Sequence, residues 1–329
     1  MPIEPGAGGA RVCVIGSYAK ALVMTADRIP APGETLLGRD YRQTFGGKGS
    51  DMAVQAARLG ARVGYVGVVG DDLFGREFVS LLEQEGVELS GLRITDQRPT
   101  GVGFIIKDEA GRNVIVVDMG ANELLDRGDI DRAGEQLGAC DVALAQLEIP
   151  LDTALYGLSA ARRAGARTIL NPAPAVDLRG HDLSMVDVIT PNQTEARLLL
   201  GLGPESDADD AGIAHDLLAL GAGAVAITRG DEGALLFQRR AAGSRDVTAT
   251  SVAPFPIDLV DSNGAGDSFN AGLAVALAEG LELRAAGRFA AAVAALCCEH
   301  WETVPSYRHR DAVDAFLRAA GGSPVHREP

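Results

Sequence analysis

In the second half of the chain, short apolar runs alternate with longer segments that carry apolar residues at helical spacing. Short uninterrupted apolar runs predict buried strands, and longer stretches with an apolar stripe at helical spacing predict helices. The predicted strands are residues 142–147, 167–170, 187–190, 224–228 and 234–237. The predicted helices are residues 151–164, 193–200, 209–220, 265–279, 283–299 and 310–319. This alternation predicts an α/β fold of three Rossmann-like layers, in which helices cover both faces of a mostly parallel sheet.

The first half contains two stretches that depart from this rhythm. Residues 11–16 and 63–69 predict strands, and residues 50–59 and 74–85 predict helices, as in the second half. In contrast, residues 18–45 are broken by Pro and Gly, and residues 101–117 resemble a hairpin around a polar turn at 108–111. We therefore predict a single domain over residues 1–329, with a small β-sheet lid formed by about 18–45 and 98–119.

Composition and charge restrict the possible partners. Of the 329 residues, 47% are hydrophobic and 23% are charged, which is typical of a globular chain. The longest apolar run, residues 289–298, is too short to cross a membrane, and the first ten residues do not resemble a signal peptide, so we expect a cytoplasmic protein without a membrane partner. A net charge of −15 without a basic stripe argues against nucleic acid. An anionic substrate would need backbone amides or a metal ion to hold it.

The strongest local motif is the segment Gly264-Ala265-Gly266-Asp267 at the start of a predicted helix. The two glycines allow backbone N–H groups to point into one concavity, where the helix dipole also favours an anion. A carboxylate beside such a site can accept the proton of an attacking alcohol during phosphoryl transfer. The alternative is an ordinary helix start, at which an acidic residue favours the dipole.

A second glycine cluster, Gly46-Gly47-Lys48-Gly49-Ser50-Asp51, also stands at a helix start. It is not a Walker A loop, because Gly49 follows Lys48 where that loop requires Ser or Thr. The backbone amides, with Lys48 and Asp51, could bind a small polar ligand. The alternative is a capped helix start with a solvated lysine.

Two further segments follow predicted parallel strands, at the sheet edge where ligands of open α/β folds gather. In the first, Asn192 and Glu195 fall on one side of a first helical turn, with a spacing that suits water-mediated contact with Mg²⁺. A helix-capping pair would show the same spacing. In the second, residues 228–233 form either part of a ligand site or a surface turn.

In this order, the segments resemble the ribokinase-like (PfkB) carbohydrate kinases. Gly-Gly-Lys-Gly near the start and Gly-Ala-Gly-Asp near the end are the two signatures of that family. The resemblance runs from about residue 12 to residue 316 and also includes the segments at 32–35, 146–148, 171–174 and 190–192. It implies transfer of the ATP γ-phosphoryl group to a sugar hydroxyl, with Mg²⁺ and in many members a monovalent cation.

The resemblance also implies roles for individual residues. Asp267 would be the general base, and the anion hole would be formed by Gly264, Ala265 and Gly266. Asn192 would lie by the phosphates and, with Glu195, near Mg²⁺. The nucleotide would be lined by Thr228, Gly230, Gly233 and Gly266. The sugar would be faced by Gly47, Lys48, Gly49, Asp51 and Glu148.

Departures from the family pattern concern the sugar. Ribokinases carry Asn and Asp where this chain has Ala19 and Ala21, and Asn where it has Asp51. An unpaired ribose hydroxyl costs about 1–3 kcal/mol at a buried site. Unmodified ribose is therefore not the expected best substrate unless Lys20 or Asp51 supplies replacement contacts.

The segment that binds a monovalent cation in the family also differs. Glu302 and Thr303 stand where the family has a small Gly-Ala turn, although Asp261, a candidate K⁺ ligand, is present. The resemblance therefore leaves activation by K⁺ open.

Other functions remain open at this point. A nucleoside kinase on the same fold would place a base in the room left by Ala19 and Ala21. A catalytically silent sugar- or nucleotide-binding protein would share the fold without turnover. The exposed lid strands are also expected to pair between two subunits, which predicts a homodimer.

Overall fold

The computed structural model describes residues 9–108, 112–240 and 246–321, so residues 109–111 of the predicted turn lie outside it. The strands are β1 (Arg11–Ile15), β2 (Ala19–Thr25), β3 (Arg39–Gly46), β4 (Arg62–Gly70), β5 (Glu88–Thr95), β6 (Gly101–Lys107), β7 (Asn113–Asp118), β8 (Val142–Gln146), β9 (Arg167–Asn171), β10 (Val188–Ile189), β11 (Ala224–Thr228), β12 (Ala234–Arg239) and β13 (Val247–Val252). The α-helices are α1 (Lys48–Arg58), α2 (Leu73–Gln84), α3 (Arg127–Arg132), α4 (Gly134–Ala139), α5 (Leu151–Arg163), α6 (Gln193–Leu198), α7 (Asp210–Ala219), α8 (Ala265–Ala278), α9 (Leu283–Cys298) and α10 (Arg310–Ala319).

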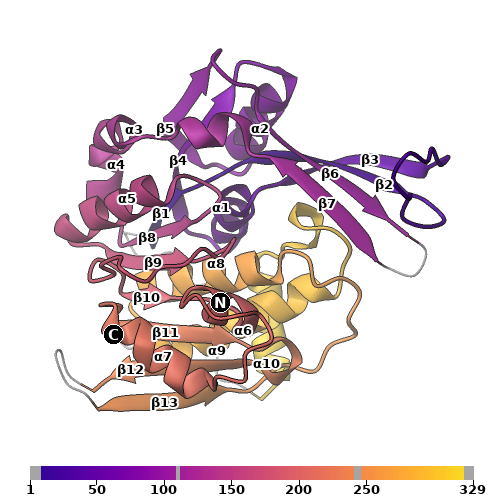
Figure 1. Ribbon diagram of the computed structural model, residues 1–329. Helices are drawn as coiled ribbons and strands as arrows, with labels where there is room; N and C mark the ends of the chain where they lie inside the picture. Colours follow the sequence, from indigo (N-terminus) through magenta and orange to yellow (C-terminus); the bar gives the residue numbers. More distant parts are fainter. Residues whose placement is uncertain (1–8, 109–111, 241–245, 322–329) are drawn as a thin grey trace.

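Nine strands form one large sheet in the order β13-β12-β11-β10-β9-β8-β1-β4-β5. Neighbours from β11 to β5 run parallel, and β12 and β13 are antiparallel additions at one edge. Helices lie on both faces of this sheet (Figure 1). The predicted three-layer α/β fold is confirmed.

Successive strand residues bury their side chains in two separate cores. In β1, Val12 and Val14 face a core shared with α1, α2, α8, α9 and α10, whereas Cys13 and Ile15 face a core shared with α3 to α7. This period of two explains why the middle residues of the central strands are mostly apolar on both faces of the sheet. Helix α8 packs against strands β1, β8 and β9 and against α9, and almost all of its side chains are buried.

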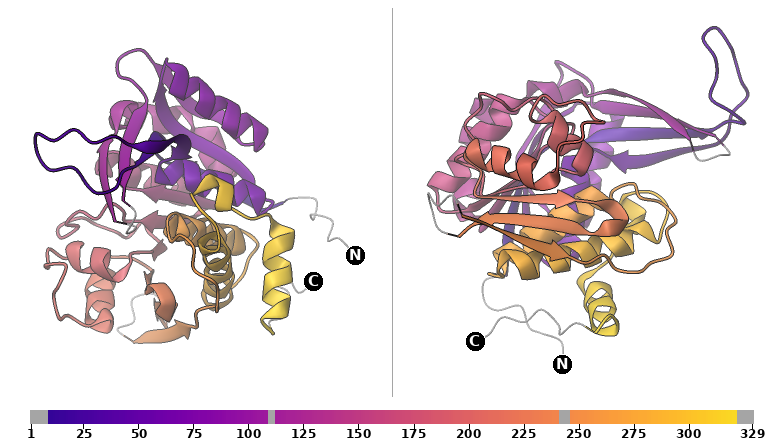
Figure 2. Two further views of the ribbon diagram at one scale, coloured as in Figure 1. Left: turned by 90° about the vertical axis from the view of Figure 1, so that its right-hand side faces the viewer. Right: turned by 60° about the horizontal axis from the view of Figure 1, so that its bottom comes forward.

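A second sheet of four strands, in the order β3-β2-β6-β7, projects from the body (Figures 1 and 2). Strands β6 and β7 form the predicted antiparallel hairpin, and β2 joins them through a parallel pairing with β6. Both stretches that broke the helical rhythm thus contribute to this small sheet. No helix among the described residues is both long and apolar enough to cross a membrane.

Four elements were not predicted from the sequence. Strands β5 and β13 lie at the two edges of the large sheet, where burial is incomplete and the apolar alternation is weak. Helices α3 and α4 have only six residues each, too few to display a helical stripe.

Candidate active site

The start of α8 presents backbone N–H groups without a side-chain cap. Gly264 is the N-cap residue, at φ 78°, a left-handed conformation that glycine adopts without strain. The N–H of Ala265 donates to the Ser262 carbonyl at 3.3 Å, whereas those of Gly266 and Asp267 have no acceptor among the described residues. A Cβ on Gly266 would meet nothing within 4 Å. The helix start is therefore open to a ligand.

Asp267 lies in the first turn of α8, and only 7% of its surface is exposed. No described hydrogen-bond donor contacts its carboxylate. Burial raises the pKa of Asp267 to about 6, the nearby Lys48 ammonium opposes that shift, and Glu148 and Glu195 add to it. A carboxyl group with such a pKa is ionised at neutral pH and still basic enough to accept a proton.

The start of α1 is closed by protein contacts. Gly47 caps the helix at φ 90°, and the N–H of Lys48 donates to Oε2 of Glu148 at 2.8 Å. The Ser17 hydroxyl donates to the same oxygen at 2.6 Å. A Cβ on Gly49 would lie 2.4 Å from the Ser17 nitrogen, so glycine is required for this close approach. Oε1 of Glu148 has no partner among the described residues and remains available to a ligand.

The Lys48 ammonium interacts electrostatically with acids at both helix starts. Asp267 is the strongest influence on the Lys48 pKa and raises it, burial opposes the shift, and Glu148, Glu195 and Asp51 raise it further. Sequence reasoning assigned Lys48 to the sugar alone. In the structure, the charge of Lys48 is influenced by acids of both helix starts and of the α6 start.

Asp51 is also buried, at 3% exposure, and its Oδ1 atom has no hydrogen-bond partner among the described residues. Burial raises the pKa of Asp51 well above its usual value, and the carboxylates of Asp267 and Glu148 raise it further. A buried oxygen without a partner is costly unless a ligand or water satisfies it.

The carboxyl ends of β10 and β11 bring the other predicted residues together. Asn192 and Glu195 form a capping box at α6: the Asn192 N–H donates to Oε2 of Glu195, the Glu195 N–H donates to Oδ1 of Asn192, and both distances are 2.8 Å. Asn192 also forms a parallel bridge with Thr228. Beyond Thr228, Gly230 and Gly233 both adopt positive φ, and a Cβ on Gly233 would lie 2.1 Å from the Val252 carbonyl oxygen.

The Asp261 carboxylate is already engaged. Its Oδ1 accepts the Asn263 N–H at 3.0 Å, and its Oδ2 accepts the Asn263 amide at 3.3 Å and the Glu302 N–H at 3.3 Å. Both oxygens that a K⁺ ion would use therefore have N–H donors.

Ala19 and Ala21 present no polar side chain on their face of the small sheet. Ala19 pairs with Gly46 and Gly101, while Ala21 pairs with Thr44 and Gly103. Lys20, between them, points to the opposite face. There its ammonium lies 2.6 Å from Glu77 and over the Phe45 ring. Lys20 is thus not available to replace the missing sugar contacts.

Sequence reasoning missed two residues of this site, Ser17 and Gln146. Both are fully buried, and the Gln146 amide donates to the Ser17 hydroxyl at 2.9 Å while its oxygen accepts the Glu148 N–H at 2.7 Å. The available signal was a polar residue at the end of an otherwise apolar strand.

Comparison with known proteins adds independent information. Residues 10–309 match the pfkB family carbohydrate kinase description. The chain is 40% identical over 285 residues to the ribokinase of Bacillus subtilis, which covers 87% of this chain and 92% of that protein. It is 33% identical over 261 residues to the deoxyribokinase of Salmonella typhi, which covers 78% of this chain and 82% of that protein.

Solved structures agree with this relationship. The ribokinase of Thermotoga maritima matches with a TM-score of 0.83 and 30% identity, over 94% of this chain and 99% of that one. Arabidopsis thaliana ribokinase complexed with ribose and ATP matches with a TM-score of 0.81 and 28% identity, over 94% of this chain and 99% of that one. The chain belongs to the pfkB family of carbohydrate kinases and is an ATP-dependent carbohydrate kinase.

Proposed function

We propose that this kinase transfers the γ-phosphoryl group of ATP to a hydroxymethyl group of a sugar or sugar-like compound at the start of α8. The observation that carries the proposal is the combination of open N–H groups at Gly266 and Asp267 with a buried carboxylate on Asp267. Amides stabilise the charge of the migrating phosphoryl group, and the carboxylate serves the acceptor alcohol.

In the proposed reaction, Asp267 accepts the proton of the acceptor hydroxyl as its oxygen forms a bond to the γ-phosphorus. The bond from that phosphorus to the β–γ bridging oxygen breaks, and ADP leaves. The amides of Gly264 to Gly266 would form the anion hole, with the Ala265 N–H released from the Ser262 carbonyl. The Lys48 ammonium, whose pKa is raised by Asp267 and Glu148, would offset the negative charge.

The nucleotide is proposed to lie along the carboxyl ends of β10 and β11, by Asn192, Thr228, Gly230, Gly233 and Gly266. Mg²⁺, which ATP brings, would neutralise charge on the phosphate oxygens. Asn192 and Glu195 fit water-mediated contact with it, because Oε1 of Glu195 is left free by the capping box. Within the described residues, no three His, Cys, Asp or Glu side chains gather as metal ligands, so waters and phosphates would supply the other positions.

The acceptor is proposed to lie against Gly47, Lys48 and Gly49, with its hydroxyls on Oε1 of Glu148 and Oδ1 of Asp51. The alanines of β2 offer no hydrogen bond to further hydroxyls. We therefore infer that sugars with fewer hydroxyls on that side, such as 2-deoxyribose, are used at least as well as ribose.

A panel of free sugars, deoxysugars and nucleosides, assayed for ADP release, tests this proposal. We expect turnover with at least one sugar or deoxysugar that has a primary hydroxyl. Turnover with nucleosides alone would indicate a nucleoside kinase instead. Binding of ligands by calorimetry without ATP consumption across the panel would indicate a silent binding protein.

We also infer a homodimer formed through the small sheet. Strand β7 lies at the edge of that sheet, and its four central residues, Val114 to Val117, are apolar and each more than 40% exposed. An apolar edge strand of this kind is a template for pairing with another chain. Light scattering should give twice the mass of 34.1 kDa, and a charged substitution, Val116→Lys, should reduce it. A 34.1 kDa species at micromolar concentration would contradict the inference.

A further inference from the structure

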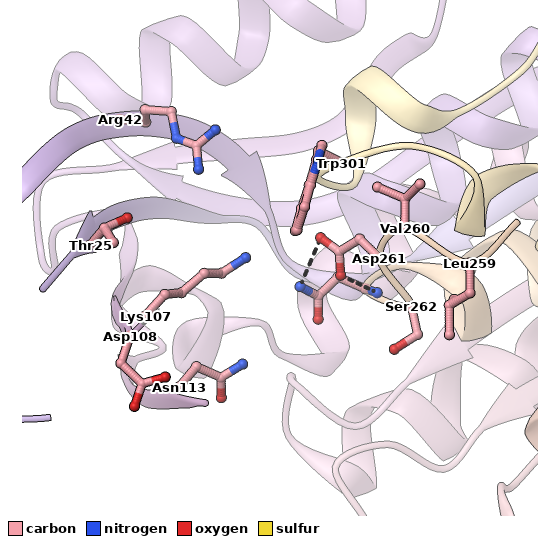
Figure 3. A pocket seen from close by; sticks show the side chains of 11 residues that line it. Thr25, Arg42, Lys107, Asp108, Asn113, Leu259, Val260, Asp261, Ser262 and Trp301 are labelled. Atoms are coloured by element: carbon pink, nitrogen blue, oxygen red, sulfur yellow. Dashed lines mark hydrogen bonds between the residues drawn. The ribbon is translucent and has the colours of Figure 1, made fainter. Parts of the chain in front are cut away.

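A cavity of about 530 Å³ separates the small sheet from the loop that leads into α8 (Figure 3). One wall carries side chains of the small sheet, including those of Thr25, Lys107 and Asn113. The opposite wall carries Asp261 and Trp301. The cavity thus lies between the two parts of the molecule that must act together on the two substrates.

Residues 301–303 connect these two walls through three contacts. Glu302 and Arg42 of β3 form an ion pair with 3.0 Å between Oε1 and Nη1. The Thr303 hydroxyl donates to the carbonyl of Phe45 in β3 at 3.2 Å. The ring of Trp301 lies under the Lys107 ammonium, 5.8 Å from ring centroid to Nζ.

The same turn also contacts the loop before α8. The Glu302 N–H donates to Asp261 at 3.3 Å, and Asp261 accepts the N–H of Asn263 at 3.0 Å. Asn263 directly precedes Gly264, the N-cap of α8. A continuous series of contacts therefore runs from Arg42 in the small sheet to the proposed anion hole.

Glu302 occupies an unfavourable backbone conformation. Its φ of 69° lies in the left-handed region, which non-glycine residues rarely adopt. Glycine would adopt it without strain. Strain of this kind persists where surrounding contacts determine the conformation, and here both the N–H and the carboxylate of Glu302 have partners.

We propose that Glu302 is a positioning residue that couples the small sheet to the anion hole. Its carboxylate is held by Arg42, and its N–H fixes Asp261 and thereby the loop ahead of Gly264. The sheet that covers the sugar then helps to set the amides that receive the phosphoryl group. This inference rests on the proposed function of the α8 start.

Three variants test the coupling. Glu302→Gly removes the carboxylate and relieves the left-handed strain, so the melting temperature should stay the same or rise while kcat falls. Arg42→Met removes the other half of the pair from a distant strand, and kcat should fall by a similar factor, about 2- to 30-fold. Since the two residues act in series, the double variant should be no slower than the slower single variant.

A matched control is Asp40→Gly. Asp40 also carries an acidic side chain at positive φ, 54°, in the same strand as Arg42. Among the described residues, its only ion-pair partner is the neighbouring Arg39 at 3.8 Å, and it forms no ion pair with the 301–303 turn. This variant should keep normal kcat. KM for ATP should change less than kcat in the Glu302 and Arg42 variants, because the coupling acts on the transition state.

Hydrogen exchange provides a readout that does not depend on turnover. In Arg42→Met, the amides of residues 264–267 should exchange faster than in the natural chain. The proposal would be overturned by unchanged exchange together with unchanged kcat in Arg42→Met. It would also be overturned if a lowered melting temperature accounted for the loss of kcat in Glu302→Gly, or if the losses of kcat multiplied in the double variant. Faster exchange in a chain that phosphorylates no sugar would leave the coupling standing and refute the proposed function instead.

Discussion

Helices α1 and α8 pack against each other and begin in the same manner, with an N-cap glycine at positive φ, no side-chain cap and a buried aspartate in the first turn. Their glycines serve different purposes. At α1, Gly49 allows close packing against Ser17, and the N–H of Lys48 is bonded to Glu148. At α8, Gly266 faces open space, and its N–H is free among the described residues. Glycine thus permits close packing against Ser17 at the start of α1, whereas at α8 it leaves open the N–H groups that we propose receive the phosphoryl group.

The largest expected effect on kcat distinguishes Asp267 of α8 from Asp51 of α1. Asp267→Asn removes the proposed proton acceptor, so kcat should fall by about 10²–10⁴-fold. Nucleotide affinity, measured by calorimetry, should remain, and the melting temperature at neutral pH should not fall, because an ionised carboxylate with a burial-raised pKa destabilises the folded state.

The matched substitution Asp51→Asn changes a group that is proposed to contact the sugar. It should alter KM for the acceptor while kcat stays within the range of the natural chain. Near-normal kcat in Asp267→Asn, or an equal loss in the two variants, would contradict the distinction drawn between the helix starts.

The two glycines provide the next contrast. Gly49→Ala would force a methyl group against the Ser17 backbone, so the free energy of unfolding should fall by about 1–3 kcal/mol or more. Gly266→Ala meets no protein atom, and alanine favours helix, so stability should be unchanged or rise by up to about 1 kcal/mol. Its turnover should fall, because the methyl group occupies space over the amides.

Chemical denaturation and steady-state kinetics measure both effects. A destabilised Gly266→Ala variant with normal kcat would reverse the assignment of packing and ligand roles.

A smaller effect is expected from the residues that hold the closed start of α1. Ser17→Ala removes one of the two donors to Oε2 of Glu148 and leaves the Gln146 amide without its acceptor. Stability should fall by about 1–3 kcal/mol, and KM for the acceptor should rise while the affinity for ATP is kept.

Thr168→Ala is the matched control for this variant. The Thr168 hydroxyl is also buried and bonded, to the carbonyl of Met185, but it lies in β9 and outside the site. It should lose stability without a change in KM. A similar rise of KM in both variants would show that the effect of Ser17 is not specific to the sugar site.

The smallest effect concerns K⁺. Since the Asp261 oxygens already accept three N–H donors, replacement of K⁺ by a bulky organic cation at equal ionic strength should leave kcat unchanged. Strong activation by K⁺ would mean that Asp261 exchanges these donors for the ion.

Much of the fold was accessible from the sequence because apolar burial is strongest where the strands are central. The edge strands β5 and β13 were missed because their apolar alternation is weak, and α3 and α4 were missed because six residues are too few to show a helical stripe. The motifs predicted both helix starts, and the resemblance assigned the phosphoryl group to the α8 start and the sugar to the α1 start. They did not predict that the α1 start is closed by contacts with Ser17 and Glu148 while the α8 start is open. That difference depends on contacts between segments remote in sequence, such as Gly49 with Ser17. The contact between Glu302 and Asp261 is of the same kind. The local sequence pattern carries no signal for either contact.

The pH dependence of kcat/KM tests the central assignment most directly. Asp267 must be ionised to accept a proton, and burial raises its pKa to about 6, so kcat/KM should decline as the pH falls through about 6. This acidic limb should be absent from the residual activity of Asp267→Asn. A profile that stays level to well below pH 5, or a limb that persists in the Asp267→Asn variant, would contradict the account.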